Sequence, residues 1–311
     1  MEFFRRTPSI DFMGQRRITY VISLILMLGS FALLAVRGLN LGIDFTGGVV
    51  IEVSYPGAAD IDSARAALAE AGFPDAQVQT FGSSRDLSVR VPPAANEQIT
   101  AISRRVGEAL GQVDPGVQIR RTEVVGPQVG EDLTEQGGLA ILFTFIFILI
   151  YVGFRFEKKM AAGTVLAAMH DPIVILGFFA ATQITFDLSV LAAVLAVIGY
   201  SINDTVVVFD RVREVFLSLR KATPLEVLNT ALNQTLSRTV MTSFSVLFVV
   251  VALYLFGGET LKGFSLAIIV GVVIGSYSSI FVAGALALDM GVKAQDLMAV
   301  KKEDPELDAL P

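Results

Sequence analysis

The chain has 311 residues, of which 53% are hydrophobic and only 17% are charged, and its mean hydropathy is +0.64. Soluble domains carry about 25% charged residues, so this composition indicates long apolar segments and a membrane protein. The chain has no cysteine and a single histidine, His170, which excludes disulfides, thiolate metal sites and multi-histidine zinc or iron sites. The net charge of -6 identifies no partner, because the charges are divided among the loops.

Residues 1–17 precede the first long apolar segment and are expected to be cytoplasmic or interfacial. Their first fifteen positions include the apolar residues Phe3, Phe4, Ile10, Phe12 and Met13. This pattern favours a segment that lies at the membrane surface, and a flexible tail is the alternative.

The first long apolar segment, residues 18–36, follows a cluster of arginines. A basic start before an apolar run is typical of a signal peptide, but the apolar part of a signal peptide is about 7–15 residues long. Residues 18–36 can cross a bilayer core of about 30 Å, and no small-residue cleavage pattern precedes Arg37. We therefore expect an uncleaved transmembrane helix.

Residues 37–136 differ from the rest of the chain, because charges are frequent and the patterned elements are short. The expected elements are a strand at 48–55, a helix at 60–72, strands at 76–81 and 86–91, a helix at 96–111 and a strand at 117–125. Asp60 and Gly72 are start and stop signals for the first helix, and Gly82-Ser83-Ser84 is expected to form a turn. This order predicts an α+β domain of the ferredoxin-like βαββαβ type, outside the cytoplasm because it follows the first span.

Five further apolar segments approach or exceed the roughly 17 residues that a span requires. They are residues 138–154, 161–181, 188–209, 240–256 and 264–288. Basic residues concentrate after the second span, between the fourth and fifth spans and after the sixth, so the positive-inside rule places both termini in the cytoplasm. The sequence thus predicts a helical membrane bundle: helix 1 at 18–36, a periplasmic domain at 37–136, helices 2–6 within 137–290 and a cytoplasmic tail at 291–311.

The cytoplasmic linker at 210–238 contains apolar residues at helical spacing. We expect a helical hairpin-like link on the membrane surface, broken near Pro224. In the sixth span, Gly271 and Gly275 form a GxxxG pair that predicts close helix packing.

Asp204 is the strongest functional candidate, because it lies inside the fourth span, roughly 8 Å from the end expected at residue 209. Such a carboxylate usually faces the bundle interior or water and marks an ion or proton path. Its polar neighbours Ser201, Asn203 and Thr205 are secondary candidates that suit a short water chain. The alternative is that the helix ends earlier and that Asp204 caps it.

Arg238 opens the fifth span and is the expected charge partner of Asp204 if the fourth and fifth helices are adjacent. The alternative is an ordinary basic anchor at a helix end. Thr242, one turn further, is a secondary polar candidate. His170 and Asp171, near the middle of the third span, are also secondary candidates, since their other reading is that they satisfy backbone groups freed by Pro172.

Two glycine-containing segments border the inserted domain and are interpreted as stiff hinges. The hinge residues are Gly42, Asp44, Gly47, Gly48, Gly126, Pro127 and Gly130. Glycines there suit tight turns or a close backbone approach. A phosphate-binding loop is excluded, because no helix is expected after residues 42–48 and no GK[ST] sequence is present.

Four motifs resemble one family in this order and spacing: GIDFTGG, VGPQVG, GYSINDTVVVFDRVRE and NQTLSRTVMTS. The chain resembles the SecF family, which are subunits of the bacterial SecDF accessory complex for protein export within the resistance-nodulation-division superfamily. The resemblance extends over essentially the whole chain.

The resemblance implies six helices that form half of a pseudo-symmetric twelve-helix unit with SecD in the cell inner membrane. It implies no enzymatic activity and no metal or cofactor, with protons as the coupling ion and Asp204 and Arg238 on their path. The unit would use the proton-motive force to promote preprotein translocation after the SecA step, beside SecYEG and YajC. Its contacts are the preprotein and the lipid bilayer, and no nucleic acid.

Two other functions remain open from the sequence. A proton-coupled exporter of small molecules or lipids from the same superfamily would need a hydrophobic substrate cleft in the inserted domain. An intramembrane hydrolase built on Asp171 and Asp204 would need the two carboxylates close enough to share a proton.

Overall fold

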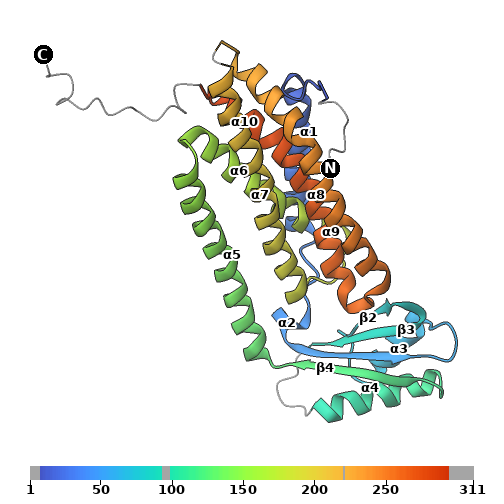
Figure 1. Ribbon diagram of the computed structural model, residues 1–311. Helices are drawn as coiled ribbons and strands as arrows, with labels where there is room; N and C mark the ends of the chain where they lie inside the picture. Colours follow the sequence, from blue (N-terminus) through green and yellow to red (C-terminus); the bar gives the residue numbers. More distant parts are fainter. Residues whose placement is uncertain (1–7, 93–98, 220, 294–311) are drawn as a thin grey trace, which may run out of the picture.

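The computed structural model describes residues 8–92, 99–219 and 221–293. Within them, six helical segments are long and apolar enough to cross a membrane. They form an elongated bundle with a small α+β domain at one end (Figure 1). The segments are α1 (Arg16–Val36), α5 (Pro127–Arg155), α6 (Lys158–Thr182), α7 (Leu188–Ser218), α8 (Pro224–Phe256) and a sixth composed of η2 (Glu259–Leu261), α9 (Lys262–Tyr277), η3 (Ser278–Ala283) and α10 (Gly284–Asp289).

The inserted domain contains a four-stranded sheet with the order β2-β3-β1-β4, in which each neighbouring pair is antiparallel. Its elements are α2 (Ile43–Thr46), β1 (Gly48–Ser54), α3 (Ile61–Glu70), β2 (Gln77–Phe81), β3 (Ser83–Val91), α4 (Ile99–Val113) and β4 (Gln118–Val125). From β1 to β4 they follow the predicted order, and α2 is an addition. The expected start of the second helix at Asn96 lies outside the described residues.

The domain has its own core because alternate residues of its strands point to opposite faces. On one face, Ile51 and Leu87 are fully buried together with Leu68 of α3 and Leu110 of α4. The other face turns toward the bundle, where Gln79 of β2 donates a hydrogen bond to Thr185. The Asp60 side chain accepts hydrogen bonds from the backbone amides of Asp62 and Ser63, as predicted for a helix start.

Two expected boundaries are wrong. The second membrane helix begins at Pro127, not near residue 138, so the domain ends at Gly126 instead of residue 136. Gly126 is the N-cap and Pro127 occupies the first turn, where its missing amide hydrogen costs nothing. Strand β3 begins at Ser83, so the expected three-residue turn shrinks to Gly82, whose φ is +81°.

The segment predicted as a surface link, 210–238, consists of the end of α7 and the start of α8. The break near Pro224 is confirmed, and Thr223 forms a capping box with Glu226 there. Before α1, residues 8–15 pack against α8. The amide of Ile10 donates to Asn233 Oδ1 (2.8 Å), and the Met13 side chain is fully buried. Residues 8–15 are therefore packed against the bundle, which contradicts the flexible-tail alternative for this part. Phe3, Phe4 and most of the tail at 291–311 lie outside the described residues.

Helix α7 lies at the centre of the bundle, against α6, α8 and α9. The predicted close packing of the glycine pair is confirmed there. A Cβ atom on Gly271 would lie 2.5 Å from Val197, and one on Gly275 would lie 3.0 Å from the Cβ atom of Ser201. By contrast, α5 stands apart from the other helices (Figure 1), and a cavity of about 430 Å³ with an almost wholly apolar lining separates it from α6 and α7.

Candidate functional site

Asp204 is buried in the middle of α7, with 2% of its surface exposed. Because α7 continues to Ser218, Asp204 does not cap a helix end, and that alternative is wrong. Its Oδ2 atom is buried and has no hydrogen-bond partner. A buried carboxylate oxygen without a partner is costly, so its retention inside an apolar bundle points to a functional role.

Helices α7 and α8 are antiparallel neighbours, which brings Asp204 and Arg238 to the same level of the bundle. Asp204 lies as many residues before the end of α7 at Ser218 as Arg238 lies after the start of α8 at Pro224. A hydrogen bond of 3.0 Å between Tyr200 Oη and Ser243 Oγ supports this register, since each of these residues is about one helical turn further from the connection.

Arg238 does not form an ion pair with Asp204 within 4.0 Å, although its charge acts on that carboxylate. Arg238 is exposed, whereas the neighbouring residue Thr239 is buried, with 2% of its surface exposed. The Thr239 Oγ1 atom, like Asp204 Oδ2, is buried without a hydrogen-bond partner. Sequence reasoning missed Thr239, because only the rotation of α8 about its axis decides which of two adjacent residues faces the interior.

The secondary candidates divide into two groups. Ser201 and Thr205 are buried on the same face of α7 as Asp204, whereas Asn203 is exposed. Thr242 donates its hydroxyl hydrogen to carbonyl oxygens of its own helix, those of Arg238 and Thr239. The structure therefore brings Ser201 and Thr205 to the site, but not Asn203 or Thr242.

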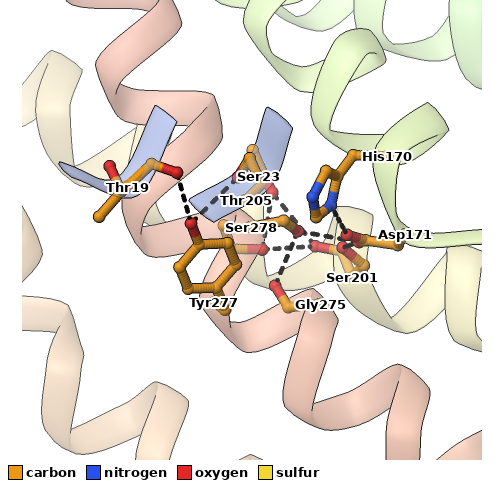
Figure 2. A network of polar contacts seen from close by, with 10 residues as sticks. Thr19, Ser23, His170, Asp171, Ser201, Thr205, Gly275, Tyr277 and Ser278 are labelled. Atoms are coloured by element: carbon orange, nitrogen blue, oxygen red, sulfur yellow. Dashed lines mark hydrogen bonds and ion pairs between the residues drawn. The ribbon is translucent and has the colours of Figure 1, made fainter. Parts of the chain in front are cut away.

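Asp171, on α6, is the centre of a second polar cluster and is completely buried (Figure 2). Its Oδ1 atom lies 3.0 Å from His170 Nδ1, and its Oδ2 atom accepts hydrogen bonds from the hydroxyls of Ser201 and Ser278, the latter at 2.9 Å. These partners come from α6, α7 and the sixth span. The carboxylate thus joins three membrane helices.

The same cluster continues into the turn after α9. Ser279 Oγ donates to the carbonyl of Ser201 at 3.1 Å and lies 2.9 Å from Thr205 Oγ1. Ser278 and Ser279 open η3, a π-helical segment, and π-helical turns are frequent at functional sites. Three serines within four residues of an apolar span, Ser276, Ser278 and Ser279, are the signal from which sequence reasoning could have found this part of the site.

Tyr277 links the sixth span to α1 (Figure 2). Its hydroxyl donates to the carbonyl of Thr19 at 2.8 Å and lies 3.0 Å from Ser23 Oγ. On the other side of the sixth span, Ser276 Oγ lies 2.8 Å from Ser243 Oγ of α8. Hydroxyl groups therefore connect the sixth span to α1, α6, α7 and α8.

The predicted hinge residues form a packed joint between the domain and the bundle, made of residues 40–48, 126–134 and 183–188. A Cβ atom on Gly130 would lie 2.7 Å from the Gly47 amide nitrogen, and Gly47 itself has a φ of +67°. The predicted close backbone approach is therefore confirmed. Gly42 donates its amide hydrogen to the Phe186 carbonyl at 2.8 Å.

Two charged side chains stabilise this joint through hydrogen bonds. The Asp44 carboxylate accepts a hydrogen bond of 2.9 Å from the amide of Leu188, the first residue of α7, where a negative charge is favourable. Arg90 of β3 donates to the Leu41 carbonyl and to Thr46 Oγ1, and its burial lowers the pKa of its guanidinium. The joint thus connects the sheet directly to the helix that carries Asp204.

Comparison with known proteins places the chain in a family. The family described as "Protein export membrane protein SecD/SecF, C-terminal" matches residues 105–293, and the "SecD/SecF GG Motif" matches residues 32–55. The chain belongs to the SecD/SecF family. It is 45% identical to protein translocase subunit SecF of Vibrio alginolyticus over 320 residues, covering 100% of this chain and 99% of that protein. It is 47% identical to SecF of Pseudomonas aeruginosa, covering 95% and 96%.

Two solved SecDF structures share the fold. The translocon-associated SecDF of Thermus thermophilus matches with a TM-score of 0.84 and 35% identity, and SecDF in a "Super-membrane-facing form" with 0.69 and 34%. Each match covers 93% of this chain and only 39% of the SecDF chain. This family member is therefore a multi-pass membrane protein that corresponds to the SecF part of those longer chains.

The geometry argues against the hydrolase alternative. Aspartic catalysis needs two carboxylates that share a proton. Both oxygens of Asp171 are engaged with His170, Ser201 and Ser278, and no hydrogen bond joins this carboxylate to Asp204. The exporter alternative requires a substrate cleft in the inserted domain, whereas the apolar cavity described above lies among α5, α6 and α7.

Proposed function

We propose that this chain is an accessory subunit of the Sec preprotein translocase that uses the proton-motive force, together with SecD, to promote protein export. The observation that carries the proton coupling is the buried carboxylate of Asp204, which has one unpartnered oxygen and lies at the level of Arg238 on the neighbouring helix without an ion pair to it. Asp204 is the group that takes up and releases the proton, and Arg238 is its charge partner.

The energies involved are of matching size. A charged side chain at the centre of a span costs about 2.5–3.5 kcal/mol, and one elementary charge moved through 100 mV releases about 2.3 kcal/mol. That release changes the ratio of two conformations by about 50-fold. Protonation of a single carboxylate is therefore enough to change which arrangement of α7 and α8 is favoured.

The joint supplies the mechanical connection. Helix α7 carries Asp204 at its centre and begins at Leu188, whose amide is bound by Asp44 of the segment that leads into β1. A shift of α7 would therefore be passed to the domain through packed backbone. The two SecDF structures match this chain with different TM-scores, 0.84 and 0.69, at equal coverage. This difference supports the proposal that parts of the fold change their relative arrangement within this family.

The remaining assignments are part of the same proposal, and family membership and the fold support them. The domain is a periplasmic ferredoxin-like module, which the sheet order β2-β3-β1-β4 supports. The bundle is half of a twelve-helix unit with SecD in the bacterial inner membrane, which the longer SecDF chains support. Both termini are cytoplasmic, and protons are the coupling ion without another cofactor. The partners are SecYEG, YajC and the translocating preprotein. SecA acts before this subunit.

The decisive experiment replaces Asp204 by asparagine in the full complex. Preprotein transport into inverted membrane vesicles is measured with and without a protonophore. Asp204→Asn is expected to abolish the protonophore-sensitive part of transport while the subunit still co-purifies with SecD. The matched control is Asp210→Asn on the same helix, where the carboxylate pairs with Arg155 at the surface and such pairs contribute about 0–1 kcal/mol. Full protonophore-sensitive transport in Asp204→Asn would contradict the proposal.

A further inference from the structure

Asp171 holds together the surroundings of Asp204 without touching it. Ser201 lies less than one helical turn before Asp204 on α7, and its hydroxyl donates to Asp171 Oδ2. The carbonyl of the same serine accepts hydrogen bonds from Ser279 Oγ at 3.1 Å and from Thr205 Oγ1 at 3.2 Å. Both polar groups of Ser201 are therefore committed to this cluster, and the turn of α7 that carries Asp204 is anchored through them.

The sixth span approaches this anchor very closely. A Cβ atom on Gly275 would lie 3.0 Å from the Cβ atom of Ser201 and 3.6 Å from Asp171 Oδ2. One turn later, Ser278 donates to both Asp171 Oδ2 (2.9 Å) and the Gly275 carbonyl (3.1 Å), at the point where the π-helical segment begins. Hydrogen bonds to an ionised acceptor are roughly twice as strong as neutral ones, so a single carboxylate can fix this irregular turn against α7.

We propose that Asp171 is a positioning residue of the proton-coupling site: its carboxylate binds Ser201 and Ser278 and thereby fixes the register between α7, which carries Asp204, and the π-helical turn that packs against α7. This inference rests on the function proposed above for Asp204. It assigns Asp171 no contact with the transferred proton, and it gives the serines of the sixth span a role beyond helix packing.

Other ionisable groups lie on the elements around Asp171. They include His170 on α6, Tyr200 and Asp204 on α7, Arg238 on α8, Tyr277 on α9 and Tyr20 on α1. His170 has a buried Nε2 atom without a hydrogen-bond partner. A measurement of transport against pH in an Asp171 variant would therefore not separate a positioning role from titration of the His170–Asp171 pair. The test must therefore report on Asp204 directly.

Labelling by dicyclohexylcarbodiimide, which reacts with protonated buried carboxyls, gives such a report. The labelled fraction of Asp204 is measured by peptide mass spectrometry as a function of pH in the intact complex. The variants are Asp171→Asn, which keeps the shape but removes the charge, and Ser278→Ala, which removes one donor. The matched control is Ser265→Ala, because Ser265 is also fully buried on α9 but its hydroxyl has no hydrogen-bond partner.

Asp171→Asn and Ser278→Ala are each expected to move the labelling midpoint of Asp204 by at least about one pH unit, a tenfold change in the protonation equilibrium. Ser265→Ala should leave it unchanged. Because the two substitutions remove one shared contact, the double variant should shift the midpoint less than the sum of the single variants. If Asp171→Asn fails to assemble, Ser278→Ala carries the test.

The outcomes separate this inference from the function on which it rests. Unchanged midpoints in both Asp171→Asn and Ser278→Ala would overturn the positioning role, even where Asp204→Asn abolishes protonophore-sensitive transport. Shifted midpoints with normal transport in Asp204→Asn would uphold the positioning contact and overturn the proposed function. An equal shift in Ser265→Ala would also overturn the inference, since any change in this span would then disturb Asp204.

Discussion

The joint and the bundle centre hold their parts together by different means. At the joint, the backbones at Gly47 and Gly130 lie so close together that there is no room for a side chain, and Asp44 and Arg90 add hydrogen bonds. At the bundle centre, Gly271 and Gly275 also pack closely against α7, but many contacts are hydrogen bonds between side chains, around Asp171 and between Ser243 and Ser276. Packed backbone can transmit a displacement but has few alternative arrangements, whereas hydroxyls can exchange partners. The difference suggests that switching takes place in the bundle and transmission at the joint.

The strongest test of this difference removes the carboxylate at the bundle centre. Asp171→Ala leaves the His170 and Ser201 groups buried without their partner, while Ser278 keeps the Gly275 carbonyl as acceptor. Each unpartnered group costs about 1–3 kcal/mol. For two such groups we expect a destabilisation of about 2–6 kcal/mol, measured by thermal unfolding of the detergent-solubilised complex. A loss below about 1 kcal/mol would mean that side-chain bonding does not hold the centre together.

A smaller effect is expected from a methyl group added at the joint. In Gly130→Ala the new Cβ atom would lie 2.7 Å from the Gly47 amide nitrogen, and relieving such overpacking costs about 1–3 kcal/mol. Gly138→Ala on the same helix is the matched control, because a Cβ atom there meets nothing within 4 Å and alanine favours a helix. Thermal stability and export activity should both decrease in Gly130→Ala and stay unchanged in Gly138→Ala. Equal behaviour of the two variants would show that the joint is not tightly packed.

The smallest effect is expected for one hydroxyl between α8 and its neighbours. Ser243 bridges Tyr200 at 3.0 Å and Ser276 at 2.8 Å, and such bonds inside membrane proteins contribute about 0.6 kcal/mol on average. Ser243→Ala should lower stability by about that amount. Ser245→Ala, whose hydroxyl bonds only to the Met241 carbonyl of its own helix, should lower it less. A larger loss of thermal stability in Ser245→Ala than in Ser243→Ala would contradict the bridging role assigned to Ser243.

The elements that sequence reasoning predicted well share a local cause. The six spans follow from apolar length, because a helix in lipid satisfies its own backbone. The start of α3 follows from the Asp60 side chain. By contrast, Asp204 lies further from the end of its helix than the expected distance of roughly 8 Å, because α7 continues to Ser218. The start of α5 was missed because residues 127–137 are polar, although Pro127 and the Gly126 cap allow the helix to begin there.

The candidate site was predicted only in part, for a different reason. Asp204 and Ser201 were identified because a polar residue within an apolar run is visible in the sequence. Arg238 was expected to be the charge partner of Asp204 on an adjacent helix. Sequence reasoning did not show that the rotation of α8 turns Thr239 inward and leaves Arg238 exposed. Ser278 and Ser279 were not predicted to belong to the site, since a π-helical turn changes which side chains share a face.

The six spans and the presence of a buried carboxylate therefore follow from the order of residues, because both depend on transfer from water to lipid, a property of each segment alone. The partners of that carboxylate do not. They depend on how α6, α7, α8 and the sixth span are rotated and staggered, which is set by the fit of small residues such as Gly271 and Gly275 against α7. The cluster around Asp171 exists only after these helices pack together, because its donors are up to 107 positions away in the chain.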